Sequence, residues 1–352
     1  MHVLLLTHAF PPDQGGIESF SYALARGMAC DHGIRVTVAT WTRERLAEED
    51  SECFRIVRRP NAKILFTLMR EADVVLENSA FLSQALLQLA ARRPRVRVLH
   101  GRQDMALENE TRPSRRALAA CVVTARAVWT RTASEIVAVS QNIAESMGFT
   151  DATVIHNGFA SETFCRLTDP TTRDPHTLIT VSRLTHEKAV DMAVRAIRQL
   201  HDRGVPARLT IVGDGPERPR LEELASRLGV TNAVEFLGPL EPYSVNKHLN
   251  TSSVFAIPSR YEEAFGIAIL EAQAAGCAVV ASERGGIPEA MDGYGVLFPS
   301  GDQDAFTDAI HRVMTEPTAR AVIVAPTSVM RTRTNESMVA EYVRVLREVT
   351  SA

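Results

Sequence analysis

Short apolar runs alternate with helix-length segments along most of this 352-residue chain, and this alternation constrains the fold more than any other feature. In the first half it predicts strands at residues 2–7, 35–40, 54–57, 73–76, 95–100, 135–139 and 153–155, and helices at 18–29, 81–91 and 114–130. In the second half it predicts strands at 177–181, 207–212, 233–236, 253–258, 278–281 and 295–298, and helices at 189–202, 216–228, 265–275 and 303–314. Near-continuous apolar strands separated by helices are typical of a doubly wound parallel sheet. The sequence therefore predicts an α/β protein with two such Rossmann-like domains.

The alternation stops once, at the segment Asp-Pro-Thr-Thr-Arg-Asp-Pro of residues 169–175. Two prolines and no apolar side chain indicate a linker. We therefore place a first domain at 1–168 and a second at 169–334, and we expect a C-terminal helix at about 335–352 to pack back on the first. The two domains are expected to face a central cleft, because ligands of parallel sheets bind beyond the carboxyl ends of the strands.

The composition is that of a soluble globular protein, with 45% hydrophobic and 23% charged residues. A net charge of −3 argues against a nucleic-acid partner. The five cysteines are odd in number, widely spaced and without a C-x-x-C pair, which favours reduced thiols in a cytoplasmic protein over a disulfide framework or a zinc site. The N-terminal apolar run lacks a preceding basic region, and no apolar stretch reaches the roughly 20 residues that cross a bilayer.

Positive charge is concentrated in residues 92–131, where ten arginines stand against three acidic residues. Such a stretch can face an anionic partner or a membrane lipid. It can equally be a solvated helix face whose arginines pair with acids elsewhere in the fold. The sequence leaves both interpretations open.

Residues 258–272 carry the strongest signal for a ligand site. They predict the end of a strand, a charged loop, and a helix that begins near Phe265. Glu263 then stands just before the helix, and Glu271 about two turns inside it, on an otherwise apolar surface. A carboxylate there needs a partner, which can be a buried structural pair or the hydroxyl groups of a ligand.

Two further features suit an anionic ligand at the same edge of the second sheet. The start of the helix offers free backbone N–H groups at Phe265, Gly266 and Ile267, and the glycine permits close approach. Arg183 and Lys188 lie on the loop after the first strand of the second half, where two cations suit a diphosphate. Taken singly, these two residues could also be ordinary surface charges.

Glycine turns and one histidine complete the set of candidates. Gly213 and Gly215 follow a strand, but the third glycine of a dinucleotide-binding fingerprint is missing, so we expect a tight turn near a nucleotide. Gly15 and Gly16 open a helix after the first strand, as an anion site or as a plain turn. His100 ends a predicted strand and is expected to face the cleft.

In this order and spacing, the motifs resemble the retaining GT-B glycosyltransferases of family GT4, the glycosyl transferase group 1 proteins, over nearly the whole chain. Glu263 and Glu271 match the E-x7-E pattern of the family. The other matching positions are Ser182, Arg183, Glu187, Lys188 and Asp191; Gly213, Gly215, Pro216 and Glu217; Gly15, Gly16, Ile17 and Glu18; His100; and Gly285, Gly286 and Glu289. Ala189 departs from the family by replacing its usual glycine, and Ala160 by replacing its usual aspartate.

The resemblance implies a retaining, metal-independent hexosyltransferase. It would move a sugar from a nucleoside-diphosphate sugar, UDP-linked on family frequency, to a hydroxyl of a natural product, a lipid-linked glycan or a polysaccharide. The implied catalytic residues are Glu263, Arg183, Lys188 and His100. The implied donor-binding residues are Gly16, Gly213, Gly215, Phe265, Gly266, Ile267 and Glu271. The enzyme would need no cofactor besides its nucleotide sugar, and would act in the cytoplasm, at the inner membrane surface if the basic stretch contacts lipid.

Within this resemblance, Arg183 and Lys188 would hold the diphosphate and Glu271 the ribose hydroxyls. Glu263 and the backbone at 265–267 would position the sugar, with His100 and the Gly16 loop acting near the sugar and the acceptor. Three other functions fit parts of the pattern: a nucleotide-sugar epimerase, a nicotinamide dehydrogenase, and a non-enzymatic two-domain sugar-binding protein. The incomplete glycine fingerprint argues against the dehydrogenase, and the Arg183/Lys188 pair against the sugar-binding protein.

Overall fold

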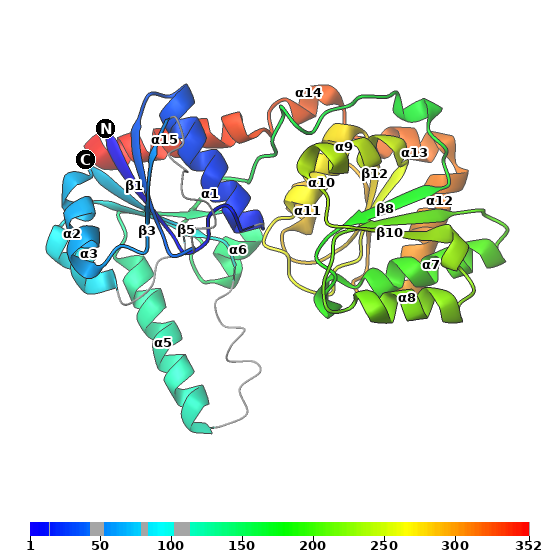
Figure 1. Cartoon of the computed structure of the whole chain (residues 1–352), viewed down its shortest axis with the longest axis horizontal. Coiled ribbons are helices and arrows are strands. Elements are labelled where there is room, and N and C mark those ends of the chain that lie inside the picture. Colours follow the sequence, from blue (N-terminus) through cyan, green and yellow to red (C-terminus); the bar gives the residue numbers. More distant parts are fainter. Residues whose placement is uncertain (14, 43–52, 79–83, 102–112, 352) are drawn as a thin grey trace. The chain divides into compact units, whose positions relative to one another are not determined.

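The computed structural model describes residues 1–13, 15–42, 53–78, 84–101 and 113–351, with the backbone alone for 113–119. The chain divides into two compact units, the first formed by Met1–Asn157 with Asn335–Ala352 and the second by Gly158–Thr334. Each unit is built on one parallel sheet with helices on its faces (Figure 1). The predicted fold of two Rossmann-like α/β domains is confirmed.

The first unit holds a seven-stranded sheet in the order β3-β2-β1-β4-β5-β6-β7. Its strands are β1 (His2–Thr7), β2 (Arg35–Thr40), β3 (Arg55–Arg58), β4 (Val74–Asn78), β5 (Arg95–Leu99), β6 (Glu135–Ala138) and β7 (Thr153–Val154). Its helices are α1 (Gly16–Arg26), the π-helical η1 (Gly27–Asp31), α2 (Ala62–Glu71), α3 (Ala85–Ala91), α5 (Pro113–Arg131), α6 (Gln141–Ser146) and α15 (Asn335–Ser351). Residues 81–83 of the helix predicted at 81–91 lie outside the described residues.

Alternating side chains of these strands face two different helical layers. On one face, Leu4, Leu6 and Val75 pack with Leu68 and Met69 of α2. The C-terminal helix α15 contacts β4, β5, α1 and η1. Tyr342 of that helix is fully buried and lies 5.7 Å from the ring of Phe20 on α1, measured between ring centroids.

The second unit holds a six-stranded sheet in the order β10-β9-β8-β11-β12-β13. Its strands are β8 (Thr177–Val181), β9 (Arg208–Val212), β10 (Val234–Gly238), β11 (Val254–Ile257), β12 (Ala278–Ser282) and β13 (Val296–Phe298). Its helices are α7 (Val190–Asp202), α8 (Arg218–Arg227), α9 (Pro242–Thr251), α10 (Ile267–Ala275), α11 (Ile287–Met291), α12 (Gln303–Thr315), α13 (Pro317–Ile323) and α14 (Thr327–Met330), with short 3-10 turns η3 (Pro170–Thr172), η4 (His186–Lys188) and η5 (Thr231–Ala233). An apolar core cluster joins these strands to α7, α8 and α12.

The second unit begins at Gly158, eleven residues before the boundary placed at 168/169 from the sequence. The backbone N–H of Leu167 donates to Asn250 Oδ1 on α9 at 2.7 Å, so this segment is bound to the second unit. Arg173, inside the segment interpreted as a linker, is buried and donates to the carbonyls of Leu249, Ser252 and Ala275. Residues 169–175 therefore belong to the second unit, because a charged side chain in them makes hydrogen bonds that the sequence does not reveal.

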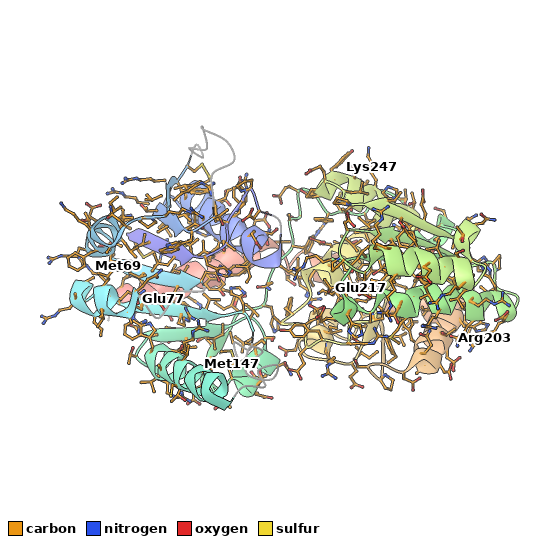
Figure 2. All side chains as sticks on the ribbon, turned by 60° about the horizontal axis from the view of Figure 1, so that its bottom comes forward. Met69, Glu77, Met147, Arg203, Glu217 and Lys247 are labelled. Carbon is orange, nitrogen blue, oxygen red and sulfur yellow. A yellow bond between two sulfur atoms is a disulfide. The ribbon has the colours of Figure 1, made fainter. Side chains whose placement is uncertain are left out.

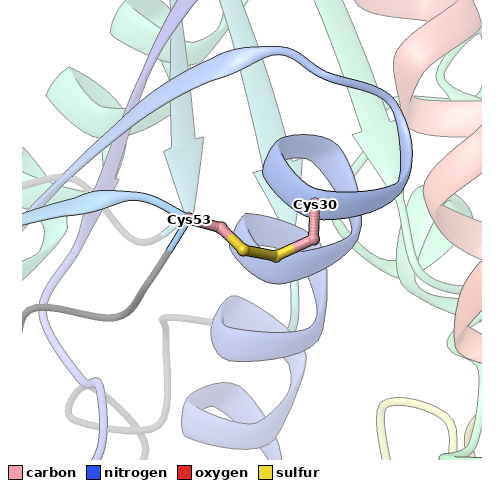
Figure 3. The surroundings of a disulfide bond; sticks show 2 residues. All are labelled: Cys30 and Cys53. Carbon is pink, nitrogen blue, oxygen red and sulfur yellow. A yellow bond between two sulfur atoms is a disulfide. The ribbon is translucent and has the colours of Figure 1, made fainter.

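The prediction of reduced thiols throughout is wrong, because Cys30 and Cys53 form a disulfide (Figure 3). The bond joins the end of η1 to the residues before β3, and the two Cα atoms are 5.6 Å apart. A separation of 23 residues gives no sign of this proximity, which arises because the β2–β3 pairing brings the segments together. The cysteines therefore no longer favour a reducing compartment.

Cys121, Cys165 and Cys277 are free, and only Cys277 of these is buried. A membrane-spanning helix is absent from the described part of the chain, whose helices are too short or too polar for that role.

Candidate active site

Four loops of the second unit follow β8, β9, β11 and β12, which lie side by side in the order β9-β8-β11-β12. All four strands are parallel, so these loops meet at one edge of the sheet. This edge carries every candidate site residue of the second half.

Lys188 and Glu263 are in direct contact although 75 residues separate them. The ammonium of Lys188, in the turn η4, lies 2.5 Å from Glu263 Oε1 in the loop after β11. The hydroxyl of Ser259 lies 3.0 Å from the same carboxylate oxygen. Both charged side chains keep some exposure, 22% for the lysine and 13% for the glutamate, so a ligand can reach the pair.

Arg260 fixes the loop after β11 against the loop after β8. Its guanidinium binds both carboxylate oxygens of Asp191 at 2.7 and 3.0 Å, and these hydrogen bonds raise the pKa of the arginine. Its backbone N–H donates to the carbonyl of Glu187 at 2.7 Å. The Lys188–Glu263 contact is therefore held by a bidentate ion pair on one side and backbone hydrogen bonding on the other.

Gly213 and Gly215 let the loop after β9 pass directly over the loop after β8. Gly213 has φ +125°, and a side chain on it would overlap the carbonyl oxygen of Ser182. A side chain on Gly215 would overlap the carbonyl oxygen of Leu184. The N–H of Leu184 donates to the carbonyl of Asp214 at 2.9 Å, so the two loops support one another.

Replacing Gly213 with alanine is expected to lower the free energy of unfolding by roughly 2 kcal/mol or more, because the new methyl group meets rigid backbone in a left-handed conformation. Gly229→Ala is the matched control, since Gly229 has φ +68° but open space around its Cα. The free energy of unfolding of Gly229→Ala should fall by only about 1 kcal/mol, the cost of holding an alanine in the left-handed conformation. Denaturant titration of both variants measures the difference, and equal losses would show that the loops can separate without cost.

Gly266 is the N-cap residue of α10 and has φ +104°, so the helix begins directly after a left-handed residue. Phe265 beside it is buried at 1% exposure, and Ile267 is the first helical residue. Gly286, after β12, donates its N–H to the carbonyl of Glu263 at 2.7 Å. The loop after β12 is thus hydrogen-bonded to the backbone just before the helix start.

Glu271 lies inside α10, and its carboxylate makes no ion pair or hydrogen bond with another described residue. Burial raises the pKa of its carboxyl to about 7, and no neighbouring cation lowers it again. The sequence left two roles open for this carboxylate, a buried structural pair and the binding of ligand hydroxyls. No described residue is placed to form the structural pair. The carboxylate is a hydrogen-bond acceptor without a donor.

Arg183 is exposed, and its guanidinium forms no ion pair or hydrogen bond with a described residue. Beside it, the hydroxyl oxygen of Ser182 is buried without a hydrogen-bond partner. Ala189, which replaces the usual glycine of the resemblance, has φ +54°. The turn therefore requires the left-handed conformation that glycine adopts most easily.

His100 and Gly16 belong to the first unit. The Nε2 atom of His100 is buried without a hydrogen-bond partner, and the ring packs edge-on against Phe20 at a centroid distance of 4.6 Å. Burial, and then the charges of Arg97 and His8, lower the pKa of His100 to about 3, so the imidazole is neutral. Gly16 begins α1, and the carboxylate of Glu18 lies beside Gly15 at that helix start.

The structure brings Lys188 and Glu263 into contact, and places the other second-unit candidates on the same edge: Arg183, Gly213, Gly215, Phe265, Gly266, Ile267 and Glu271. Sequence reasoning missed Ser259 and Arg260 as supports of the glutamate loop. Their position directly after a predicted strand was the available signal.

The family model described as "Glycosyl transferases group 1" matches residues 175–316. A GDP-mannose-dependent alpha-(1-6)-phosphatidylinositol monomannoside mannosyltransferase from Mycolicibacterium smegmatis is 30% identical over 91% of this chain and 91% of its own length. The chain belongs to the group 1 glycosyltransferases, family GT4. It is therefore a glycosyltransferase enzyme, as the motifs predict.

A second relative of this glycosyltransferase, the D-inositol 3-phosphate glycosyltransferase of Saccharomonospora viridis, is 37% identical over 43% of this chain and 37% of its own length. Among solved structures, Anabaena HepE in complex with UDP and glucose aligns over 99% of this chain and 100% of its own, with a TM-score of 0.79 and 22% identity. WaaG, a glycosyltransferase involved in lipopolysaccharide biosynthesis, aligns over 97% of this chain and 99% of its own, with a TM-score of 0.73 and 17% identity. These likenesses show that the fold is GT-B.

Proposed function

We propose that this glycosyltransferase takes its sugar from a nucleoside-diphosphate sugar bound at the carboxyl edge of the second sheet. The observation that carries the proposal is the carboxylate of Glu271, which has no hydrogen-bond donor among the described residues. Glu271 lies on α10, and this helix begins directly after the loop that holds the Lys188–Glu263 pair. Ribose hydroxyls supply the donors that this carboxylate lacks. The diphosphate then extends toward the cations Lys188 and Arg183.

The proposed mechanism is electrostatic. Glycosyl transfer passes through an oxocarbenium-like state while negative charge grows on the leaving diphosphate. Lys188, Arg183 and the N-terminus of α10 stabilise that charge without a metal ion. Glu263, aligned by Ser259 and Lys188, holds the sugar. The acceptor hydroxyl attacks the anomeric carbon from the face that the diphosphate leaves, the bond to the diphosphate breaks, and the hydroxyl proton passes to the departing phosphate oxygen, so that configuration is retained.

For the donor we propose a UDP-sugar, with GDP-mannose as the second candidate because the M. smegmatis relative depends on it. For the acceptor we propose a lipid-linked glycan, since the name of the M. smegmatis relative specifies phosphatidylinositol monomannoside, a lipid that carries a sugar. His100 of the first unit is neutral, and we assign it a hydrogen bond to the acceptor, beside the Gly16 loop. A lipid-linked acceptor would bring this enzyme to the cytoplasmic side of a membrane.

A thermal-shift screen with UDP-glucose, UDP-N-acetylglucosamine and GDP-mannose tests the proposal. A donor that binds only the folded chain should raise the melting temperature by several degrees at about a hundred times its Kd. Free sugars at the same concentration are the control. Binding of a free sugar without any nucleotide dependence would instead support a sugar-binding protein. Conversion of the sugar in the absence of an acceptor would support an epimerase.

A further inference from the structure

The Lys188–Glu263 pair joins a cation that suits phosphate to an anion that suits sugar hydroxyls. The ammonium of Lys188 lies 2.5 Å from Glu263 Oε1, and both side chains keep some exposure. An ammonium attracts phosphate oxygens, whereas a carboxylate repels them. A diphosphate bound at Lys188 therefore shares the ammonium with Glu263 and lies close to a charge of its own sign. It follows that Glu263 weakens the binding of the diphosphate itself.

Glu263 is anchored beside the lysine by contacts that do not involve Lys188. The hydroxyl of Ser259 lies 3.0 Å from Glu263 Oε1 and 3.2 Å from the carbonyl oxygen of Glu187, so the carboxylate is its nearer acceptor. Ser259 is fully buried, and its own carbonyl accepts from the hydroxyl of Ser282 at 2.8 Å. The carbonyl of Glu263 accepts from the N–H of Gly286 at 2.7 Å. The carboxylate thus keeps its position when a phosphate approaches the ammonium.

Asp191, another carboxylate of this edge, differs from Glu263 because it has a cation of its own. Both of its oxygens bind the guanidinium of Arg260, at 2.7 and 3.0 Å. Glu263 has Lys188 as its one cationic partner among the described residues, and that is the cation assigned to the diphosphate. Competition for a shared cation is therefore expected at Glu263 and not at Asp191.

The charge that faces Glu263 changes during glycosyl transfer. In the donor, the hydroxyl groups of the sugar can donate to the carboxylate. When the bond between the anomeric carbon and the phosphate oxygen breaks, the sugar becomes positively charged, and a carboxylate stabilises that charge. The new bond to the acceptor oxygen removes it again. The released terminal phosphate loses to water the proton that it took from the acceptor, and is then about one charge more negative than in the donor.

We propose that Glu263, through its contact with Lys188, discriminates between the sugar-carrying donor and the bare nucleoside diphosphate that the reaction leaves, and so promotes release of this product. The inference rests on the function proposed above, because it needs the diphosphate at Lys188. In the donor, hydrogen bonds from the sugar offset the repulsion between the carboxylate and the diphosphate. In the product the sugar is gone and the diphosphate is more negative, so the repulsion is larger and is not offset. Specificity then depends on a repulsive contact as well as on attractive ones.

Isothermal titration of the full-length wild type and Glu263→Gln tests the inference with two ligand pairs, UDP with UDP-glucose and GDP with GDP-mannose. Glutamine keeps the size of the side chain and an acceptor for Ser259, but has no charge. The variant should bind the nucleoside diphosphate about fivefold to tenfold more tightly, because the repulsion is gone and Lys188 is no longer shared with a carboxylate. It should bind the corresponding nucleotide sugar no more tightly than the wild type does, because weaker hydrogen bonds to the sugar offset the same gain.

Glu283→Gln is the matched control. Glu283 is exposed after β12 on the same edge of the sheet, and its carboxylate forms no ion pair or hydrogen bond with a described residue. This variant should bind both ligands of a pair as the wild type does. Unchanged or weaker binding of the nucleoside diphosphate to Glu263→Gln would overturn the inference. So would a gain of the same factor for the diphosphate and for the nucleotide sugar.

The wild type alone provides a second measurement, which does not depend on the folding of a variant. Its nucleotide sugar should bind at least about as tightly as the nucleoside diphosphate, because the repulsion is offset only when the sugar is present. A diphosphate that binds the wild type far more tightly than its sugar conjugate would contradict the proposed discrimination. If the wild type binds none of the four ligands, the proposed function itself fails. If it binds both members of a pair and Glu263→Gln changes their affinities equally, only the present inference fails.

Discussion

Replacing Lys188 with alanine should lower the turnover number about a hundredfold to a thousandfold while the chain remains folded. The lysine is the cation nearest to Glu263, at 2.5 Å, and in the proposed mechanism it carries much of the charge stabilisation of the leaving diphosphate. Its loss acts on the transition state more than on the bound donor, because the charge on the diphosphate grows during transfer. The turnover number should therefore fall more than the donor KM rises.

Lys247→Ala is the matched control, because Lys247 is exposed on α9 of the same unit (Figure 2) and its ammonium lies over the ring of Tyr243, 4.6 Å from the centroid. Turnover in this variant should equal that of the wild type. Circular dichroism melts of both variants confirm that any loss is not unfolding. Near-normal turnover in Lys188→Ala would remove the proposed role of this residue.

Replacing Glu271 with glutamine should weaken donor binding about tenfold to a hundredfold, because charge-assisted hydrogen bonds to the ribose become neutral ones. The same change should stabilise the ligand-free protein at pH 8. Burial raises the pKa of Glu271 from 4.5 to about 7, so its contribution to stability is complete below pH 4.5 and is lost as the pH rises through about 7. Glutamine has no charge to bury and loses nothing in that range.

Isothermal titration with the donor and denaturant titration without it measure the two effects. Glu235→Gln, on an exposed position of β10, is the control and should change neither. In the wild type, donor affinity should fall as the pH drops from about 7 toward 4.5, because the protonated carboxyl is a poorer acceptor, whereas Glu271→Gln should show no such trend. A less stable Glu271→Gln with unchanged donor affinity would mean that the carboxylate is structural.

The central strands were predictable because nearly every position in them is buried. β1, for example, is buried at all six positions, so its sequence is an uninterrupted apolar run apart from its ends. Helix α9 was missed because Asn246 and Asn250 occupy its buried side, where they bind the segment 165–168. The unit boundary was misplaced for the same reason. Helix α2 was also missed, although the N-cap Asn61, which accepts from the N–H of Ile64, was a usable signal.

The candidate site was predictable as a set of residue types on one edge of a sheet, but not as a set of contacts. Strand order and loop position place Lys188 and Glu263 on that edge. Side-chain positions, which no motif encodes, decide the contacts at this edge. Lys188 touches Glu263, Arg260 binds Asp191, and the carboxylate of Glu271 has no described partner. The disulfide between Cys30 and Cys53 belongs to the same class of feature.

The helix α15 has a consequence for how the chain folds as it is synthesised. The first unit needs residues from both sides of the second unit, and its buried Tyr342 is synthesised only after the whole second unit. Residues 158–334 leave the ribosome earlier and contain their whole sheet. Domains generally fold as units in the order in which they become complete. In this chain the second unit is synthesised completely before the first unit is. The N-terminal strands therefore remain without the helix α15 until residues 335–351 have been synthesised.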